Sequence, residues 1–496
     1  MFDEILKQSL QESLPIIQES IAYLLPELIL VGAFLGIILL DLFVKKHKEI
    51  VFTLYFWVAL GLCTSFLLPQ QTLQQTSFLG TLLHDEMAFW FRLFLVIAVF
   101  LTTLLYLRSS FYHRAPQLLS TFYTLLLGML IGLHLMVLSQ HLLLLFIAIE
   151  VVSISAYILA TLTFSKASTE ASIKYILFGA TAAALMLYGI SWLYGLTGTL
   201  YFSQPTFVAT LQTLGSPLVM VAILLTTAGL LFKITAVPLH IWTPDVYQVA
   251  PTPIVAFFSV APKIAGLAVL FRWATAWQPL AVSLGNATFT FQNLLGFVAL
   301  MSILLGNVAA LSQTNVKRLL AYSGIAQVGF LLIPVVALSE ASLSILTFYL
   351  LIYLLMNFLA FEVVSMVERR RQSVTLEGYQ GLGQQQVVLG IVVLVAMLSL
   401  TGLPPTAGFT AKLLIFSILW KSYTLSQSPL LLWLFILGIL NAAIALFYYL
   451  KLPYWMFFKQ ALKPPLSRIP WYDKSLWLLL TLLLLLFFFK ADWLLG

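Results

Sequence analysis

The sequence predicts an all-α polytopic membrane protein with about fourteen transmembrane helices, each of roughly 20 residues. Three observations lead to this prediction. Hydrophobic residues make up 61% of the 496 residues and charged residues only 9%, and the mean hydropathy of +1.02 is far above that of soluble domains. The apolar residues fall into runs long enough to cross a bilayer, and the basic residues between these runs follow an alternating pattern.

Short polar breaks separate the apolar runs and set the approximate ends of the expected helices. We place the helices at 22–44, 51–68, 86–107, 117–138, 141–163, 170–194, 217–240, 251–275, 289–311, 319–338, 343–367, 387–422, 429–452 and 471–490. The connection before the last run contains Pro464, Pro465 and Pro470 and is the expected place for an element along the membrane surface.

Basic residues collect in the connections after odd-numbered runs: Lys45, Lys46, Lys48, Arg108, Arg114, Lys166, Lys317, Arg318, Arg369, Arg370, Arg371, Lys459, Lys463 and Arg468. Connections after even-numbered runs hold little beyond Arg272 and Lys421. Because short cytoplasmic loops are rich in lysine and arginine, both termini are expected on the periplasmic side of a bacterial inner membrane. The net charge of +7 therefore reflects orientation in lipid, and we expect no nucleic-acid partner.

Cofactor chemistry is not expected in this chain. Its single cysteine, Cys63, excludes an intrachain disulfide and a cysteine-ligated iron–sulfur or zinc site. We find no glycine-rich phosphate loop, metal-ligand spacing or nucleophile motif. Any redox reaction must therefore take place in partner subunits. The acidic N-terminus, with Asp3 and Glu4, does not resemble a cleaved signal and predicts an amphipathic surface segment.

Two runs contain helix breakers beside a lysine. The seventh holds Gly229 and Pro238 around Lys233, and the twelfth holds Pro404 and Pro405 before Lys412. Proline removes a backbone donor, so both helices are expected to be interrupted near mid-membrane. Interrupted helices at matching places indicate an inverted-repeat transporter. The expected units are 1–116 with three helices, repeats at 117–275 and 289–452, and 453–496 with the last helix.

A few ionisable residues lie inside the expected spans, where a charge costs at least about 2.5 kcal/mol. Glu150 has no charged neighbour in sequence, and Lys233 on another helix is its expected partner. The pair is expected to be bistable, since Lys233 holds its proton beside Glu150 and can release it when Glu150 moves away.

His240, seven residues after Lys233, would lie about 10 Å along the same face of a continuous helix and can pass protons near neutral pH. Lys263 and Lys412 would extend the polar track, with Lys174 as an auxiliary residue. Simpler interpretations are that the lysines extend to the headgroups, that Glu150 joins helices and that His240 caps a break. Arg92 is expected to pair with nearby Asp85 or Glu86, and His84, His113, His134 and His141 are expected to lie at the interface.

Five blocks in order carry a family resemblance: EASIKYILFGATAAALMLYG, FKITAVPLHIWTPDVYQVAPTP, FFSVAPKIAG, VKRLLAYSGIAQVGF and LTGLPPTAGFTAKL. They resemble the antiporter-like membrane subunits of the proton-pumping NADH:quinone oxidoreductase, respiratory complex I, and in particular subunit N. The resemblance covers the fourth to the thirteenth span.

The resemblance implies fourteen helices in two inverted five-helix repeats and a proton relay through Glu150, Lys233, Lys263 and Lys412, with Lys174 and His240 at further motif positions. It implies FMN, iron–sulfur clusters and quinone in partner subunits. The implied partners are a second antiporter-like subunit and small membrane subunits. Gln327 departs from the family pattern, because many relatives have a histidine there and glutamine does not titrate.

Three alternatives remain open at this point. The first is a subunit of a multi-subunit cation/proton antiporter, a class that shares these lysines. The second is a subunit of a ferredoxin-linked relative of complex I. A third alternative is a scaffold whose polar residues only fix helix packing and transport nothing.

Overall fold

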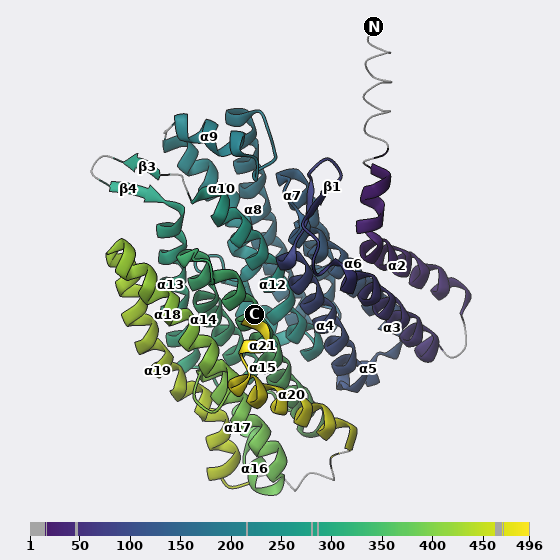
Figure 1. The fold of residues 1–496 in the computed structure, drawn as a ribbon. Coiled ribbons are helices and arrows are strands. Elements are labelled where there is room, and N and C mark those ends of the chain that lie inside the picture. Colours follow the sequence, from purple (N-terminus) through teal and green to yellow (C-terminus); the bar gives the residue numbers. More distant parts are fainter. Residues whose placement is uncertain are drawn as a thin grey trace.

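Nearly every apolar run of the sequence forms a helix in the computed structural model, which describes residues 15, 17–44, 48–214, 217–278, 281–284, 287–461, 469 and 471–495. Figure 1 shows the helices as one elongated bundle. The expected amphipathic segment with Asp3 and Glu4, and the connection with Pro464, Pro465 and Pro470, lie outside the described residues.

The N-terminal part contains three long helices and a small hairpin. The helices are α2 (Leu25–Phe43), α3 (Lys48–Leu67) and α4 (Glu86–Arg108), and the strands are β1 (Gln75–Ser77) and β2 (Leu82–His84). The strands pair antiparallel with Gln75 opposite His84. Asp85 caps α4, since its carboxylate accepts the Ala88 N–H at 2.8 Å, which satisfies a donor left free at the helix start. The short elements nearby are η1 (Leu68–Gln70), α5 (Ser110–Arg114) and η2 (Pro116–Leu118).

A first set of helices follows. It comprises α6 (Leu119–Leu138), α7 (Leu142–Thr161), α8 (Lys166–Thr197), the pair α10 (Pro217–Ile234) and α11 (Trp242–Val249), and α12 (Thr252–Trp277). The short helix α9 (Pro205–Leu214) lies between α8 and α10. Helix α8 begins with a capping box between Ser165 and Ser168 and ends at Gly198, whose φ of 70° suits glycine.

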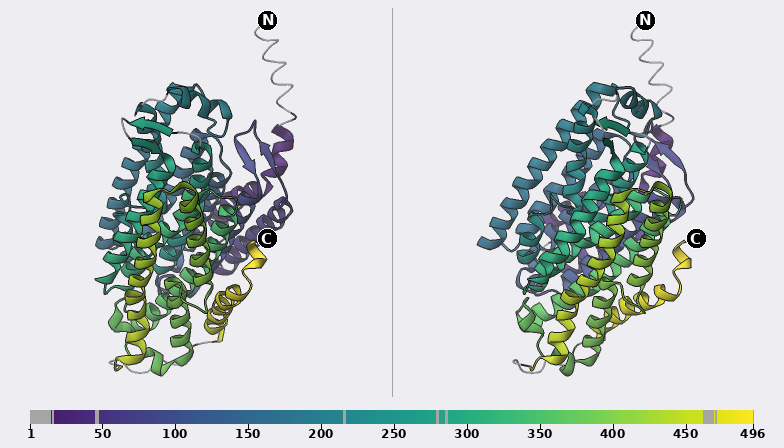
Figure 2. Two further views of the ribbon diagram at one scale, coloured as in Figure 1. Left: turned by 60° about the vertical axis from the view of Figure 1, so that its left-hand side comes forward. Right: turned by 90° about the vertical axis from the view of Figure 1, so that its left-hand side faces the viewer.

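A second set has the same composition of long and broken helices. It comprises α13 (Phe291–Leu311), α14 (Val316–Ala337), α15 (Ser342–Arg371), the pair α17 (Val387–Thr401) and α18 (Ala407–Ser426), and α19 (Pro429–Phe458). Short elements complete it: β3 (Ala281–Leu284), β4 (Ala287–Thr290), η3 (Leu376–Tyr379) and α16 (Leu382–Gln385). Strands β3 and β4 pair antiparallel with Ala281 opposite Thr290. Figure 2 shows this hairpin at one end of the bundle and α16 at the other.

The two sets pack in the same way. Helix α6 packs on α7 and α12, as α13 packs on α14 and α19; α10 packs on α8 and α12, as α17 packs on α15 and α19. Each set has five spans when a broken pair is counted as one span. Because five is an odd number, the second set would start on the opposite side of a membrane from the first. These matched pairs support the proposed division into inverted repeats at 117–275 and 289–452.

The core of the bundle is built from helices of both sets. Figure 1 shows α12, α14 and α15 between the α2–α3 hairpin on one flank and α18–α19 on the other. In α12, α14 and α15, 94% of the most apolar stretch is buried inside the chain. Helices α20 (Trp471–Phe489) and α21 (Asp492–Leu495) pack against this core, with α20 contacting α15, α17 and α18.

Length and hydropathy qualify 12 of the described helices to cross a membrane, and Val387–Thr401 is a shorter apolar helix. The all-α polytopic fold predicted from composition is therefore confirmed. The count of about fourteen stays a prediction.

Both predicted interruptions are present. Helix α10 ends at Ile234, and α11 starts at Trp242 after a segment in which Thr235 has a φ of 63° and the Val237–Pro238 peptide is cis. Helix α17 ends at Thr401, Gly402 has a φ of 86°, and α18 starts at Ala407. His240 consequently does not continue the helix of Lys233, and the spacing expected along one continuous face does not apply.

Candidate functional site

Lys233 is the last but one residue of α10 and is buried, with 4% of its surface exposed. Its Nζ donates to Ser153 Oγ of α7 at 2.6 Å. The Ser153 hydroxyl has one proton, and its possible acceptors are the Ile149 carbonyl at 2.7 Å and Glu150 Oε1 at 3.5 Å. Rotation of this hydroxyl would therefore connect the lysine amine with the glutamate.

Glu150 and Lys233 are brought close to each other but do not form a direct ion pair, since no Lys233 ion pair within 4.0 Å is found in the described part of the chain. Ser153 lies between them, three residues after Glu150 on the same helix. The Ser153 hydroxyl is therefore the link between the two side chains, and the bistability of the pair stays a prediction.

Buried polar atoms without a hydrogen-bond partner concentrate in the break after Lys233 and in helix α11, which follows it. Thr235 Oγ1, His240 Nδ1, Trp242 Nε1, Thr243 Oγ1 and Tyr247 Oη are buried and have no hydrogen-bond partner among the described residues. Buried polar atoms are nearly always hydrogen-bonded to protein or to water. These atoms are therefore candidates for binding water, and His240 is the partly exposed residue among them.

Lys263 is fully buried in the middle of α12. Its Nζ donates to the Gly324 carbonyl of α14 and to Tyr353 Oη of α15, both at 3.0 Å. Tyr353 in turn donates to the Ser259 carbonyl at 3.0 Å. Helices of both repeats thus meet at this amine, and it is held by neutral oxygen atoms alone.

Lys412 is buried on α18, and its amine returns to the end of α17. Its Nζ donates to the carbonyl oxygens of Leu400 at 3.2 Å and Thr401 at 2.6 Å. Both carbonyls belong to the last turn of α17, where the break leaves them without the usual helical partner. Lys412 Nζ also lies 4.7 Å from the centre of the Phe330 ring, a cation–π distance.

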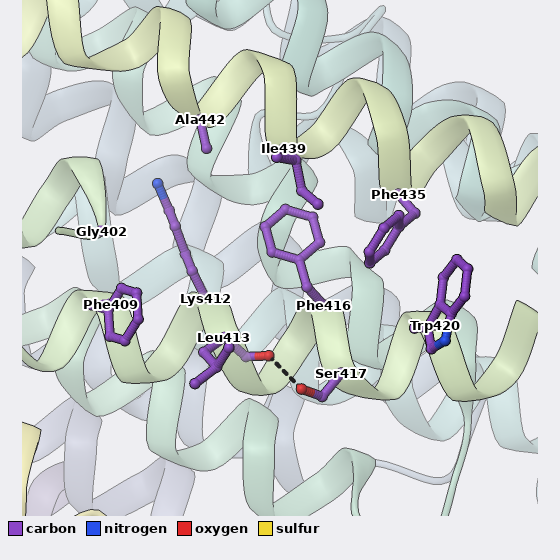
Figure 3. A pocket seen from close by; sticks show the side chains of 10 residues that line it. All are labelled: Gly402, Phe409, Lys412, Leu413, Phe416, Ser417, Trp420, Phe435, Ile439 and Ala442. Carbon is purple, nitrogen blue, oxygen red and sulfur yellow. Dashed lines mark hydrogen bonds between the residues drawn. The ribbon is translucent and has the colours of Figure 1, made fainter. Parts of the chain in front are cut away.

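A cavity of about 440 Å³ lies between α18 and α19 beside Lys412. Figure 3 shows the lysine stem crossing this space toward α19, with the ring of Phe416 next to it. The remaining lining residues are mainly apolar, and Lys412 is the charged residue among them.

Gln327 of α14 lies between the hydrogen-bond partners of Lys263 and those of Lys412. Its Nε2 donates to the Leu400 carbonyl at 2.8 Å, which is the same carbonyl that Lys412 contacts. Its other neighbours are Tyr449 Oη at 3.3 Å and Tyr349 Oη at 2.5 Å. The sequence identified Gln327 as a departure from the family pattern, but its contact with the Leu400 carbonyl could only be found in the structure.

Lys174 lies apart from the buried lysines. Its side chain is 46% exposed, and its Nζ contacts Glu170 at 3.0 Å and Asp245 of α11 at 3.3 Å. Asp245 also binds Arg318 of α14 at 2.8 Å. Lys174 therefore belongs to a surface ion-pair network that ties α11 to both repeats.

The N-terminal helices contain an ionic cluster that sequence reasoning missed. Arg92 binds Glu27 of α2 at 3.1 Å, and His134 Nδ1 lies 2.9 Å from the same Glu27 oxygen. The expected pairing of Arg92 with Asp85 or Glu86 is therefore wrong, and Asp85 instead binds Arg272 at 2.8 Å. A glutamate inside the first apolar run was the signal for this cluster.

Of the four histidines expected at the interface, His84 and His134 are buried, His141 is half-buried and His113 is exposed. Burial, together with the positive charge of Arg92, lowers the pKa of His84 from 6.5 to about 4. His84 is therefore neutral at neutral pH, and its Nε2 lies 3.0 Å from Ser77 Oγ in the β1–β2 hairpin.

Two helices broken at mid-span, three buried lysines and a glutamate close to the first of them define the class of antiporter-like membrane subunits. The family described as NADH:quinone oxidoreductase/Mrp antiporter, transmembrane, matches residues 139–440. The chain belongs to this family, and within it the chain is similar to subunit N of NADH-quinone oxidoreductase.

Among curated relatives, the NADH-quinone oxidoreductase subunit N of Chlorobium chlorochromatii is 36% identical over 458 residues, which cover 91% of this chain and 88% of the relative. The NAD(P)H-quinone oxidoreductase subunit 2 of Thermosynechococcus vestitus is 36% identical over 439 residues, with 88% and 82% covered.

Solved structures agree with this assignment. A chain of respiratory complex I from Thermus thermophilus with bound aureothin superposes with a TM-score of 0.78 at 31% identity, covering 95% of this chain and 98% of that chain. A chain of the Mrp complex from Dietzia sp. superposes with a TM-score of 0.78 at 19% identity, with 96% of each chain covered, and shows a shared fold.

Proposed function

We propose that this chain is a proton-translocating membrane subunit of an NADH:quinone oxidoreductase. Protons move from the cytoplasmic side outward through Glu150, Lys233, Lys263 and Lys412, with His240 and Lys174 as auxiliary groups. The observation that carries the proposal is the set of three lysine amines, each buried in the bundle and each bonded to hydroxyl or carbonyl oxygens without a carboxylate within 4.0 Å in the described part of the chain. Lysines inside membrane spans usually have a function, because placing a charged amine in the bilayer costs free energy.

The driving signal is a change in the position of Glu150 relative to Lys233. When Glu150 approaches, Lys233 keeps its proton, and when Glu150 withdraws, the amine is left with the neutral Ser153 hydroxyl. Lys233 then gives its proton to the hydrated break around His240 and from there to Lys263. Moving one charge against 100 mV costs about 2.3 kcal/mol, which redox chemistry in partner subunits must supply.

The partners in this proposal are the other membrane subunits, among them a second antiporter-like subunit and small subunits. FMN, iron–sulfur clusters and quinone belong to those partners, and lipid surrounds the chain. The complex lies in a bacterial inner membrane with both termini of this subunit at the periplasmic side. Bacterial relatives named as NADH-quinone oxidoreductase subunits support this placement.

The proposal is tested with Glu150→Gln and Lys233→Ala in the assembled complex, reconstituted into vesicles. We expect both variants to lower the number of protons moved per electron while assembly is retained. Lys421→Ala is the matched control, since Lys421 lies on the exposed side of α18. Unchanged proton movement in the assembled Glu150 and Lys233 variants would refute the relay and favour a scaffold.

The alternative of a cation/proton antiporter subunit rests on the shared family and on the shared fold with the Mrp complex. Copurification of redox cofactors with the assembled complex distinguishes the two functions. Flavin and iron–sulfur absorbance will accompany an oxidoreductase subunit and will be missing from an antiporter assembly.

A further inference from the structure

Gln327 occupies the point where four helices meet between Lys263 and Lys412. Its three partners come from three other helices: Tyr349 from α15, Leu400 from α17 and Tyr449 from α19. The side chain is 2% exposed. Both amide hydrogens and the amide oxygen are used, so the side chain has little freedom to rotate.

The orientation of the amide follows from its partners. A carbonyl oxygen can only accept, so the nitrogen of Gln327 must face Leu400 at 2.8 Å. The oxygen then accepts from Tyr349 Oη at 2.5 Å. This leaves the second N–H for Tyr449 Oη, which donates to Ser323 Oγ at 2.9 Å.

The Leu400 carbonyl is shared by two donors. Gln327 Nε2 and Lys412 Nζ both donate to it, at 2.8 Å and 3.2 Å. The oxygen is free to accept both because α17 ends one residue later, at Thr401. The amide thus fixes one of the two carbonyls that hold the lysine amine.

The same network extends toward Lys263. Ser323, which accepts from Tyr449, precedes Gly324, whose carbonyl binds Lys263 Nζ at 3.0 Å. The ionisable groups around the junction are two amines and four phenols: Lys263, Lys412, Tyr349, Tyr353, Tyr448 and Tyr449. None of these hydrogen bonds in the described part of the chain involves a histidine or a carboxylate.

We propose that Gln327 is a positioning residue that holds Lys412 at the end of α17 through the Leu400 carbonyl and aligns the Tyr449–Ser323 hydroxyls between the two lysines. This inference rests on the proposed proton translocation for its consequence, since a displaced Lys412 amine would then exchange protons with Lys263 less readily. The amide itself neither takes up nor releases a proton at accessible pH.

The first test compares Gln327→Leu with Asn357→Leu. Asn357 is a buried amide on α15 whose Nδ2 donates to the Tyr353 carbonyl of its own helix at 2.8 Å, so it controls for the loss of a buried amide that does not bind the Leu400 carbonyl. The position of Lys412 is measured by the rate at which a small apolar amine-reactive reagent labels it in the assembled complex, detected by mass spectrometry. The cavity beside Lys412 gives the reagent access.

We expect Gln327→Leu to raise the labelling rate of Lys412 by about fivefold, the factor expected when a neutral hydrogen bond such as the one from Gln327 to the Leu400 carbonyl is lost. The number of protons moved per electron should fall, and the Asn357 variant should match wild type in both measurements. If Lys412 is labelled at the wild-type rate in Gln327→Leu, the positioning role is overturned.

The second test uses the pH profile. Gln327→His can restore one donor to Leu400 but introduces a group that titrates near pH 6.5. Proton movement in this variant should show an inflection near that pH in addition to those of the wild-type profile. A Gln327→His profile identical to that of wild type would contradict the position of Gln327 beside the path between Lys263 and Lys412.

The two proposals fail in different ways. If Lys412→Ala moves protons normally while Gln327→Leu still exposes Lys412, the relay is refuted and the positioning role stands. If Lys412→Ala stops proton movement while Gln327→Leu changes neither labelling nor proton movement, the relay stands and the positioning role is refuted.

Discussion

Lys263 shows how a lysine amine can be accommodated inside this bundle without a carboxylate. Its acceptors are one backbone carbonyl and one phenol, from α14 and α15. The carbonyl belongs to Gly324, where a Cβ atom would lie 2.8 Å from Lys263 Nζ. Glycine at this position therefore leaves the space that the amine occupies.

Gly324→Ala should displace the amine without unfolding the helix, because the tip of a lysine side chain can move away. Proton movement per electron should fall by about tenfold, since a shift of about 1 Å at a reacting group costs up to about a hundredfold. Gly195→Ala on α8 is the matched control, because nothing lies within 4 Å of its added Cβ. Equal proton movement in the two assembled variants would show that the contact with Gly324 is unimportant.

At this scale the sequence predicted which residues lie deep in the membrane but not what holds them. Lys233, Lys263 and Lys412 were identified because lysine is rare in apolar runs. Their partners are a serine hydroxyl, a phenol and carbonyl oxygens of distant helices, and neither common hydroxyls nor backbone carbonyls stand out in a sequence.

The broken helices were predictable at the scale of elements, because proline has a local effect on the backbone. Pro238 and the Pro404–Pro405 pair lie within the observed interruptions. The consequence for Lys412 was not predictable. Its amine bonds to the end of α17, and this contact depends on how α18 folds back beside α17.

The α2–α3 hairpin is attached to the rest of the bundle through a contact that the sequence prediction got wrong. Arg92 was assigned to acids close in sequence, whereas its partner Glu27 lies 65 positions away on α2. Glu27 and Arg92 are both buried, at 4% and 0% exposure. Nearness in sequence is a poor guide where helices assemble side by side.

Glu27→Leu should destabilise the protein by about 3–5 kcal/mol, because it leaves the Arg92 charge buried without its partner. The double variant Glu27→Leu with Arg92→Leu removes both charges and should recover part of this loss. Thermal unfolding of the purified protein in detergent measures the difference, with the exposed Glu340→Leu as a control. If the double variant is no more stable than Glu27→Leu, the pair is not what attaches α2.

Across the whole molecule, Lys263 is the lysine of the three that lies at the contact between the two sets of helices. It comes from the first set and bonds to α14 and α15 of the second. Helices α12, α14 and α15 are also the most buried of the described spans. The fold thus encloses the Lys263 amine inside the bundle, whereas Lys233 and Lys412 each bond within their own set.

The class of a polytopic all-α membrane protein could be predicted from composition and periodicity, since both reflect the bilayer itself, whereas the count of about fourteen helices stays a prediction. The contacts of the candidate residues could not be predicted, because Lys174 binds Asp245 in a surface network and Ser153 lies between Glu150 and Lys233. These contacts depend on the relative placement of whole helices.

The most direct test of the account is the number of protons moved per electron in reconstituted complex carrying Lys263→Gln, with Lys421→Gln as control. Glutamine keeps a polar group of similar length beside Gly324 and Tyr353 but cannot carry the proton. We predict a lower ratio in the Lys263 variant and a normal ratio in the control, with both complexes assembled. A normal ratio in the assembled Lys263 variant would contradict the claim that protons pass through the buried amines.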